Sequence, residues 1–204
     1  MLKRTKGRLL LTLLVTTGLA GTLKHTSLTS QERKLAVNLM KDSRTEVLNS
    51  TKGLSEKQLR FKPSKESKSI GIYIEQVAVT ENDLWQLLET TMKAPANSEK
   101  RLEVKFNDEE LIKMIEDGCD VTPSAEAPQK TKWKNANEAL SDFKNKRAAH
   151  IKYLRSSTED LRNHVVQMSF GWIDCYQLSL MIAARNKCYV QEINEIKQEP
   201  AFPK

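Results

Sequence analysis

The stretch Ile182–Lys197 reads IAARNKCYVQEINEIK, and it decides the fold because it forms most of a long amphipathic helix. At 100° per residue, the apolar side chains of this region cluster around one direction: Leu178, Met181, Ile182, Ile193 and Ile196. Arg185 and Tyr189 project within about 20° of the centre of that cluster. A fixed positive charge therefore stands on the face that the helix is expected to bury, and it requires a partner or a site.

A second long helix, expected from about residue 67 to residue 93, carries a matching charge. Its apolar positions keep the spacing of three and four that an amphipathic helix requires, and Glu81 falls among them. An unpaired buried charge costs several kcal/mol, so buried charges are normally paired. Glu81 and Arg185 are therefore the candidate ion pair. The alternative is that both side chains lie near a bundle end and reach water.

The rest of the sequence predicts a helical protein with one domain. We expect further helices over about 30–50, 107–117, 137–156 and 174–198, a short helical step near 54–59 and a surface loop over 120–132. No alternating apolar and polar segment of any length indicates a strand. A chain of 204 residues, 39% apolar and 29% charged, suits one helical domain, which we place at residues 28–204. The predicted fold class is all-α, a four-helix bundle with short additional helices.

The N-terminus has the pattern of a secretory signal peptide over residues 1–23. The basic residues Lys3, Arg4, Lys6 and Arg8 precede an apolar stretch over 9–23, and Ala20 offers a small-residue cleavage site. That stretch is short for a membrane span, which needs about 20 residues, so we expect periplasmic or extracellular export without a stable membrane span. An uncleaved anchor or a basic arm is the alternative. Removing four cations from the net charge of +7 leaves +3, which weakens the case for a nucleic-acid partner.

The cysteines Cys119, Cys175 and Cys188 show no CxxC spacing, which argues against a zinc site. Cys175 and Cys188 share the last helix, where 13 residues separate them by about 20 Å, too far for a disulfide. We therefore expect free, mostly buried thiols. A nucleophilic Cys188 would need nearby cations to stabilise its thiolate, whereas buried cysteines are usually inert.

Histidine usage gives no ligand set either. None of His25, His150 and His164 is spaced with another histidine, cysteine or carboxylate as metal ligands are, so each is interpreted as a surface or packing residue. The basic and aromatic segment Lys132-Trp133-Lys134 is interpreted as a solvated loop, since one tryptophan is weak evidence for a nucleic-acid site.

Several stretches in order resemble the DinB/YfiT-like family of four-helix bundle proteins. They are LSEKQLRFKP at 54–63, SIGIYIEQVA at 69–78 followed by Glu81 and Trp85, FGWIDCYQ at 170–177, the IAA at 182–184 and the ending at 195–204. Members with an intact site hold a divalent metal with three histidines, one on the second helix and two, four residues apart, on the last. Such a pair projects to one side of a helix and can chelate one ion.

This chain differs from the family pattern at every ligand position. Gln76 stands where the second helix would carry its histidine, and Arg185 and Tyr189 stand where the last helix would carry its pair. Arginine has no lone pair to donate and repels a cation, while glutamine and tyrosine oxygens bind transition metals poorly. The resemblance therefore implies a degenerate site with no metal or other cofactor and no catalytic residues.

Three uses of such a site compete. In the first, a pocket lined by Gln76, Arg185 and Tyr189 binds a small ligand, and the arginine favours an anionic one; or the surface binds a protein partner. In the second, the chain is an enzyme like the thiol-dependent transferases or hydrolases of the resembled family, acting with an atypical metal or none. In the third, Glu81 and Arg185 replace the metal as an internal cross-link. Loss of all three ligands favours binding over catalysis, and the resemblance leaves a homodimer open.

Overall fold

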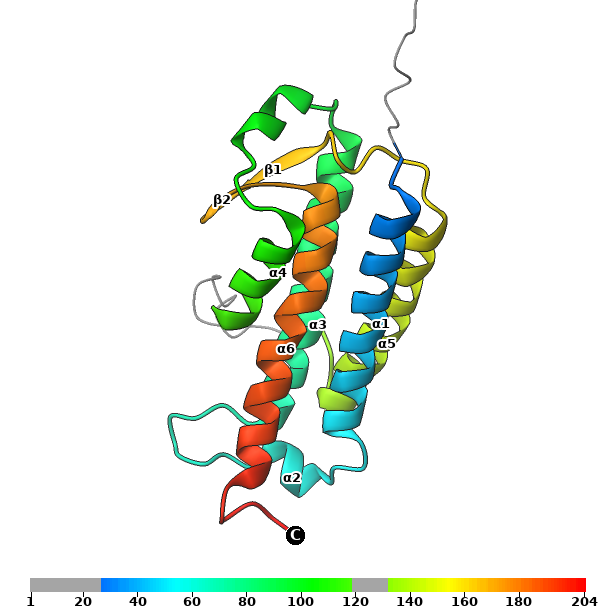
Figure 1. Cartoon of the computed structure of the whole chain (residues 1–204). Helices are drawn as coiled ribbons and strands as arrows, with labels where there is room; N and C mark the ends of the chain where they lie inside the picture. The colour runs from blue at the N-terminus through cyan, green and yellow to red at the C-terminus, as the bar shows by residue number, and fades with distance from the viewer. Residues whose placement is uncertain (1–26, 119–131) are drawn as a thin grey trace, which may run out of the picture.

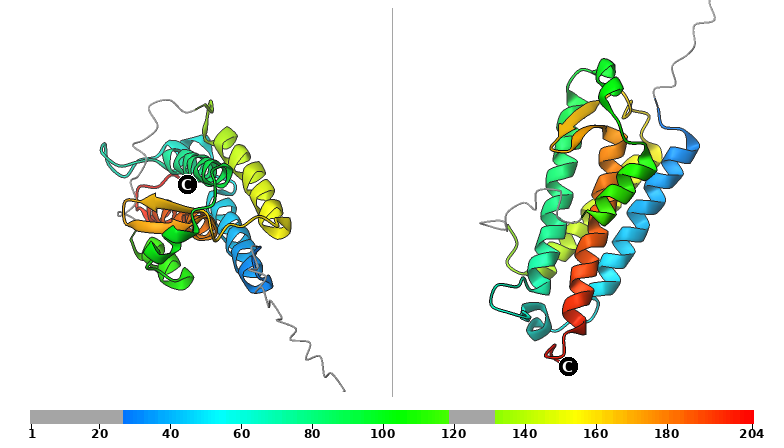
Figure 2. Two further views of the ribbon diagram at one scale, coloured as in Figure 1. Left: turned by 90° about the horizontal axis from the view of Figure 1, so that it is seen from above. Right: turned by 60° about the vertical axis from the view of Figure 1, so that its left-hand side comes forward.

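The computed structural model describes residues 27–118 and 132–204, which are predominantly helical (Figure 1). Its long helices lie side by side: α1 (Ser30–Thr51), α3 (Ile70–Lys93), α5 (Ala136–Ser156) and α6 (Cys175–Gln198). In contact order α1 meets α6, α6 meets α3, α3 meets α5 and α5 returns to α1, so the four close around a common core (Figure 2). The predicted all-α class is confirmed.

Shorter elements complete the described part of the chain. The helices α2 (Glu56–Arg60) and α4 (Asp108–Asp117) were expected from the sequence, and α4 packs on the outer side of α6. A 3-10 helix, η1 (Ser98–Glu103), follows α3 and contacts the hairpin formed by β1 (Val165–Met168) and β2 (Gly171–Asp174). No described helix is both long enough and apolar enough to cross a membrane.

Capping side chains explain why the predicted helix starts lie close to the observed ones. Each of the residues that precede α1, α2, α4 and α6 accepts a hydrogen bond from the backbone three residues later, and the acid or amide at that third position bonds back: Thr29 with Glu32, Ser55 with Gln58, Asn107 with Glu110, and Asp174 with Gln177. These reciprocal bonds satisfy backbone N–H groups that a helix start leaves without partners. The start of each of these helices is therefore determined by residues within its own first turn.

The hairpin contradicts the expectation that the chain has no strand. Val165 lies opposite Asp174 and Met168 lies opposite Gly171, so each strand has four residues, too few to show an alternating pattern. Gly171 has a φ of 138°, which residues with a side chain rarely adopt. A glycine at the start of β2 therefore permits the tight reversal.

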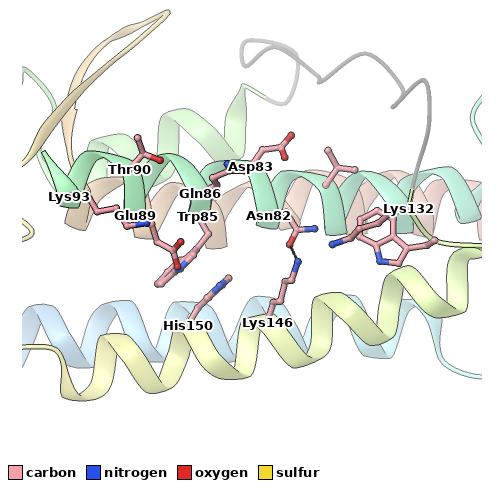
Figure 3. Close-up of a pocket in the computed structure, with 12 residues that line it drawn as sticks. Asn82, Asp83, Trp85, Gln86, Glu89, Thr90, Lys93, Lys132, Lys146 and His150 are labelled. Atoms are coloured by element: carbon pink, nitrogen blue, oxygen red, sulfur yellow. Dashed lines mark hydrogen bonds between the residues drawn. The ribbon is translucent and has the colours of Figure 1, made fainter.

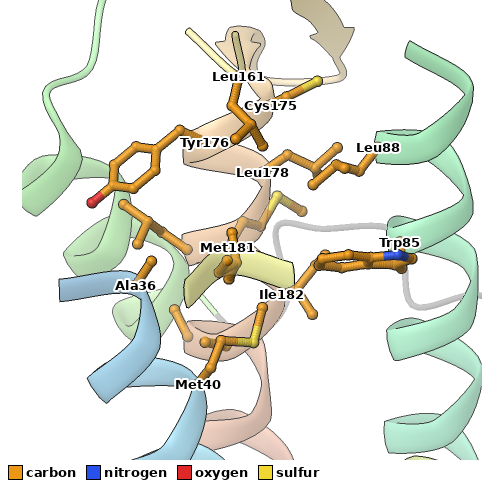
Figure 4. Close-up of a cluster of buried hydrophobic side chains, with 14 of the residues drawn as sticks. Ala36, Met40, Trp85, Leu88, Leu161, Cys175, Tyr176, Leu178, Met181 and Ile182 are labelled. Carbon is orange, nitrogen blue, oxygen red and sulfur yellow. The ribbon is translucent and has the colours of Figure 1, made fainter. Parts of the chain in front are cut away.

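The core has two parts along the length of the long helices. One surrounds α6 near the hairpin and includes Met40, Leu88, Tyr176, Met181 and Ile182 (Figure 4). The other lies toward α2 and includes Val47, Ile74, Phe143 and Ile193. Every residue of α6 from Cys175 to Asn186 is buried, because α1, α3 and α4 cover the helix on several sides.

An arginine holds the hairpin end together. Arg162 makes ion pairs with Glu32 at 2.7 Å, Asp108 at 2.6 Å and Asp174 at 3.0 Å, and its guanidinium lies 4.1 Å from the Tyr176 ring centroid. These carboxylates belong to the first turns of α1 and α4 and to the residue that caps α6. One cation therefore joins the starts of three helices and offsets the concentration of acids there.

The cysteines differ from expectation in one case. Cys175 is buried and free, as expected, and burial followed by the charge of Asp174 raises its pKa to about 12. Cys188 takes part in a disulfide, so the expectation of a free thiol there is wrong. Cys119, His25 and the expected signal peptide at 1–23 lie outside the described residues. A disulfide-bonded Cys188 cannot be the nucleophile considered from the sequence.

Candidate functional site

The sequence candidates Gln76, Arg185 and Tyr189 lie on the faces of α3 and α6 that pack against each other. The Tyr189 hydroxyl shares a hydrogen bond of 2.8 Å with Thr80, and its ring centroid lies 6.5 Å from that of Tyr73, so α6 contacts α3 on either side of Gln76. The Arg185 guanidinium lies 5.8 Å from the Tyr189 ring centroid. Gln76, Arg185 and Tyr189 are only 4%, 4% and 7% exposed. They belong to the packed interface of the two helices.

This interface offers no donor set for a metal ion. In the described residues, no group of three or more histidine, cysteine, aspartate or glutamate side chains is arranged to hold one. The Gln76 Oε1 atom is buried and accepts no hydrogen bond from residues 27–118 or 132–204. A single amide oxygen is a poor site for a transition-metal ion.

Glu81 is buried as predicted, but α5 supplies its cation. Arg147 donates from Nε to Oε1 at 2.9 Å and from Nη2 to Oε2 at 2.5 Å, and the Nδ1 atom of His150 lies 2.6 Å from Oε1. The predicted partner Arg185 lies instead beside Tyr189 on α6. The error has a physical cause: a helical pattern shows which face is buried but not which neighbouring helix it meets.

Arg147 joins all four long helices. It is fully buried, and besides Glu81 on α3 it donates to the Met40 carbonyl at 3.3 Å, to the Ser43 hydroxyl at 2.6 Å and to the Ile182 carbonyl at 3.4 Å. Its place in the sequence carried a signal, because it falls within the apolar stripe of α5 between Phe143 and Ile151. We call Glu81, Arg147 and His150 the buried charge cluster.

The cluster keeps Glu81 ionised. Burial alone would raise the pKa of this carboxyl, but the Arg147 charge and the hydrogen bonds from His150 and Arg147 together hold the pKa below its ordinary value of 4.5. An ionised carboxylate can only accept hydrogen bonds, so His150 donates to it from Nδ1. The imidazole is then held in one tautomer by Glu81, which Arg147 in turn fixes.

His150 also reaches a groove between α3 and α5 (Figure 3). The groove has a volume of about 750 Å³, and its lining includes Asn82, Asp83, Trp85 and Glu89 from α3, Lys132 and Trp133 from the segment before α5, and Lys146 and His150 from α5. The His150 ring stacks on Trp85 with centroids 3.6 Å apart and an interplanar angle of 9°. The indole Nε1 of Trp85 donates to Glu89 at 3.0 Å, which engages one of the groove's acids.

Two lysines share one carboxylate beside the groove. The Nζ atoms of Lys132 and Lys146 lie 3.1 Å and 3.3 Å from the same oxygen of Asp142, and Lys146 also donates to Asn82. Burial and the neighbouring Lys132 lower the pKa of Lys146, whereas the two lysines outweigh burial and lower the pKa of Asp142. Asp83, which also lines the groove, acts electrostatically on Lys132, so the two ammonium groups lie near the carboxylates of Asp142 and Asp83. We call Lys132 and Lys146 the lysine pair.

The remaining sequence candidates lie away from this groove or take ordinary roles. The His164 nitrogens lie 2.8 Å from the Asp160 carbonyl oxygen and 3.2 Å from that of Ala94, so this side chain joins the loop before β1 to the end of α3. His150 is a buried packing residue, and its ring also hydrogen-bonds to Glu81. Its role depends on α3 and α5 being adjacent, which its own surroundings in the chain do not reveal.

Comparison with known proteins gives no match: no family model fits the chain, and no curated protein or solved structure is significantly similar to it.

Proposed function

We propose that this protein is an exported, non-catalytic member of the DinB/YfiT-like four-helix bundles that binds a small anionic molecule in the groove between α3 and α5. The observation that carries this proposal is the lysine pair, whose two ammonium groups share the single carboxylate of Asp142. An anionic group that replaces or joins Asp142 would gain charge-assisted hydrogen bonds from both lysines. The groove's volume of about 750 Å³ falls in the range of small-molecule sites.

The proposal moves the ligand away from the former metal positions. Gln76, Arg185 and Tyr189 are packed between α3 and α6, so a ligand there would have to separate two helices of the core. The groove lies on the α5 side of α3 and needs no such opening. The anionic ligand expected from the sequence is retained, with Lys146 in the role that Arg185 was expected to have.

The disulfide supports export. Disulfides persist in oxidising compartments such as the periplasm and the cell exterior and are rare in the cytosol. The bonded Cys188 therefore agrees with the signal-peptide pattern of residues 1–23.

Calorimetric titration with small organic acids, beginning with benzoate, tests the proposal. Lys146→Met should weaken binding by about 10-fold or more, because a hydrogen bond to a charged group contributes roughly 1.5–3 kcal/mol. Lys144→Met is the matched control, since Lys144 is exposed on the same helix and does not line the groove. No binding by the wild type, or an equal loss in both variants, would refute the proposal.

A second candidate, a hydrolase or transferase, rests on the Glu81–His150 hydrogen bond of 2.6 Å, because a carboxylate that orients an imidazole is a common arrangement for a general base. The bound acid should be recovered chemically unchanged after prolonged incubation with the protein. Conversion to a product would favour this second candidate instead.

A further inference from the structure

The imidazole of His150 presents one defined nitrogen to a ligand. Glu81 accepts hydrogen bonds from Arg147 on both oxygens and takes its third from Nδ1 of His150 at 2.6 Å. Because a carboxylate cannot donate, Nδ1 carries the proton, and in the neutral ring Nε2 holds a lone pair. No residue in the described part of the chain hydrogen-bonds to Nε2. With the ring in its neutral form, the groove wall at His150 therefore offers a hydrogen-bond acceptor.

The position of this acceptor is fixed from several sides. Trp85 stacks on the ring at 3.6 Å, and the carboxylate that holds Nδ1 is itself held by the fully buried Arg147. The His150 side chain is only 9% exposed, so little of the ring is free to turn. A ligand that meets Nε2 finds the acceptor already oriented, and binding orders little more of the protein.

The acceptor and one member of the lysine pair lie about one turn apart on α5. His150 and Lys146 are four residues apart on α5, so they project to the same side of the helix about 6 Å apart along its axis. In Figure 3 both side chains project from α5 toward α3, with Trp85 and Asn82 opposite them. One small molecule is long enough to meet both.

We propose that the groove recognises organic acids that carry a hydroxyl or amino group at the end remote from the acid, with the anion at the lysine pair and the O–H or N–H donated to His150 Nε2. This inference rests on the proposed function and names its ligand class. An acid without such a donor would cover Nε2 and leave it without a hydrogen-bond partner. The groove should therefore bind that acid about tenfold or more weakly.

A matched pair of aromatic acids tests the inference: 4-hydroxybenzoate, which has a donor opposite its carboxylate, and 4-methoxybenzoate, which has an acceptor there. Calorimetric titrations of the full chain are run at pH 8, above the usual titration range of histidine. We expect the wild type to bind 4-hydroxybenzoate about tenfold more tightly. This comparison needs no variant and so does not depend on the folding of one.

The variant His150→Phe then assigns the preference to the imidazole. Phenylalanine keeps a flat ring against Trp85 and leaves both Arg147 bonds to Glu81, but it removes the nitrogens. We expect the tenfold preference to disappear, because 4-hydroxybenzoate loses its acceptor and 4-methoxybenzoate no longer covers an unpaired nitrogen. Equal affinities in the wild type, or a preference that survives in His150→Phe, would overturn the inference but leave the proposed function standing. Binding of neither acid, or binding that Lys146→Met does not weaken, would overturn both.

Discussion

Replacing Arg147 by methionine is expected to lower the free energy of unfolding by about 3–5 kcal/mol. Arg147 and Glu81 have fully buried side chains, so the change leaves a carboxylate in the interior with His150 as its remaining partner. The change also removes the two hydrogen bonds to Glu81 and those to Met40, Ser43 and Ile182. Glu81 escapes part of the cost by taking up a proton, which places the loss within that range and not above it.

Urea unfolding at pH 7, followed by circular dichroism, measures this loss. Glu81→Leu and the double variant Glu81→Leu/Arg147→Met complete a double-mutant cycle, and the double variant should regain much of the stability because neither charge is then stranded. Lys144→Met on the exposed side of the same helix should change stability by no more than about 0.5 kcal/mol. A loss below about 1 kcal/mol for Arg147→Met, or a double variant as unstable as the sum of the single ones, would refute the reasoning.

Two further predictions concern protons and thiols. Because Arg147 and His150 hold the pKa of Glu81 below 4.5 against the effect of burial, its stabilising contribution is complete above that pH and is lost as the pH falls through the folded-state pKa. The difference in unfolding free energy between wild type and Glu81→Gln should therefore shrink as the pH falls below 4.5, and a constant difference in urea titrations would contradict this assignment. Labelling with iodoacetamide, read by peptide mass spectrometry, tests the state of the thiols. Cys175 should be labelled only after denaturation, because burial raises its pKa to about 12, and Cys188 should be labelled only after reduction of its disulfide. Rapid labelling of either residue in the native, unreduced protein would contradict the structure.

The long helices could be predicted because their signals are local. The apolar periodicity of α3 and α6, together with capping residues such as Thr29 and Asp174, is written within a few turns of each helix. The hairpin at 165–174 could not be predicted in the same way, because four-residue strands show too short a pattern and their pairing depends on contacts with η1. Elements whose signals lie within their own residues could therefore be predicted, whereas an element that depends on contacts with a neighbouring one could not.

The candidate site shows the same division. That Glu81 is buried and needs a cation followed from the pattern of its own helix, but the choice of Arg147 over Arg185 depends on α5 facing that part of α3. The groove was missed for a related reason. Lys132 and Lys146 look like ordinary solvated lysines in the sequence, and only the packing of α5 on α3 brings both to Asp142.

The structure also joins two interpretations that the sequence presented as alternatives, an internal cross-link and a ligand site. Glu81 takes part in both: through Arg147 it links α1, α3, α5 and α6, and through His150 it fixes the acceptor that faces the groove. Arg147→Met should therefore disturb stability and ligand preference together, because it releases the carboxylate that orients the imidazole. His150→Phe keeps the Glu81–Arg147 pair and removes one hydrogen bond to Glu81, so it should abolish the preference with a smaller loss of stability than Arg147→Met. If the two variants instead changed stability and preference in the same proportion, the cross-link would account for both effects, and His150 would have no separate part in recognition.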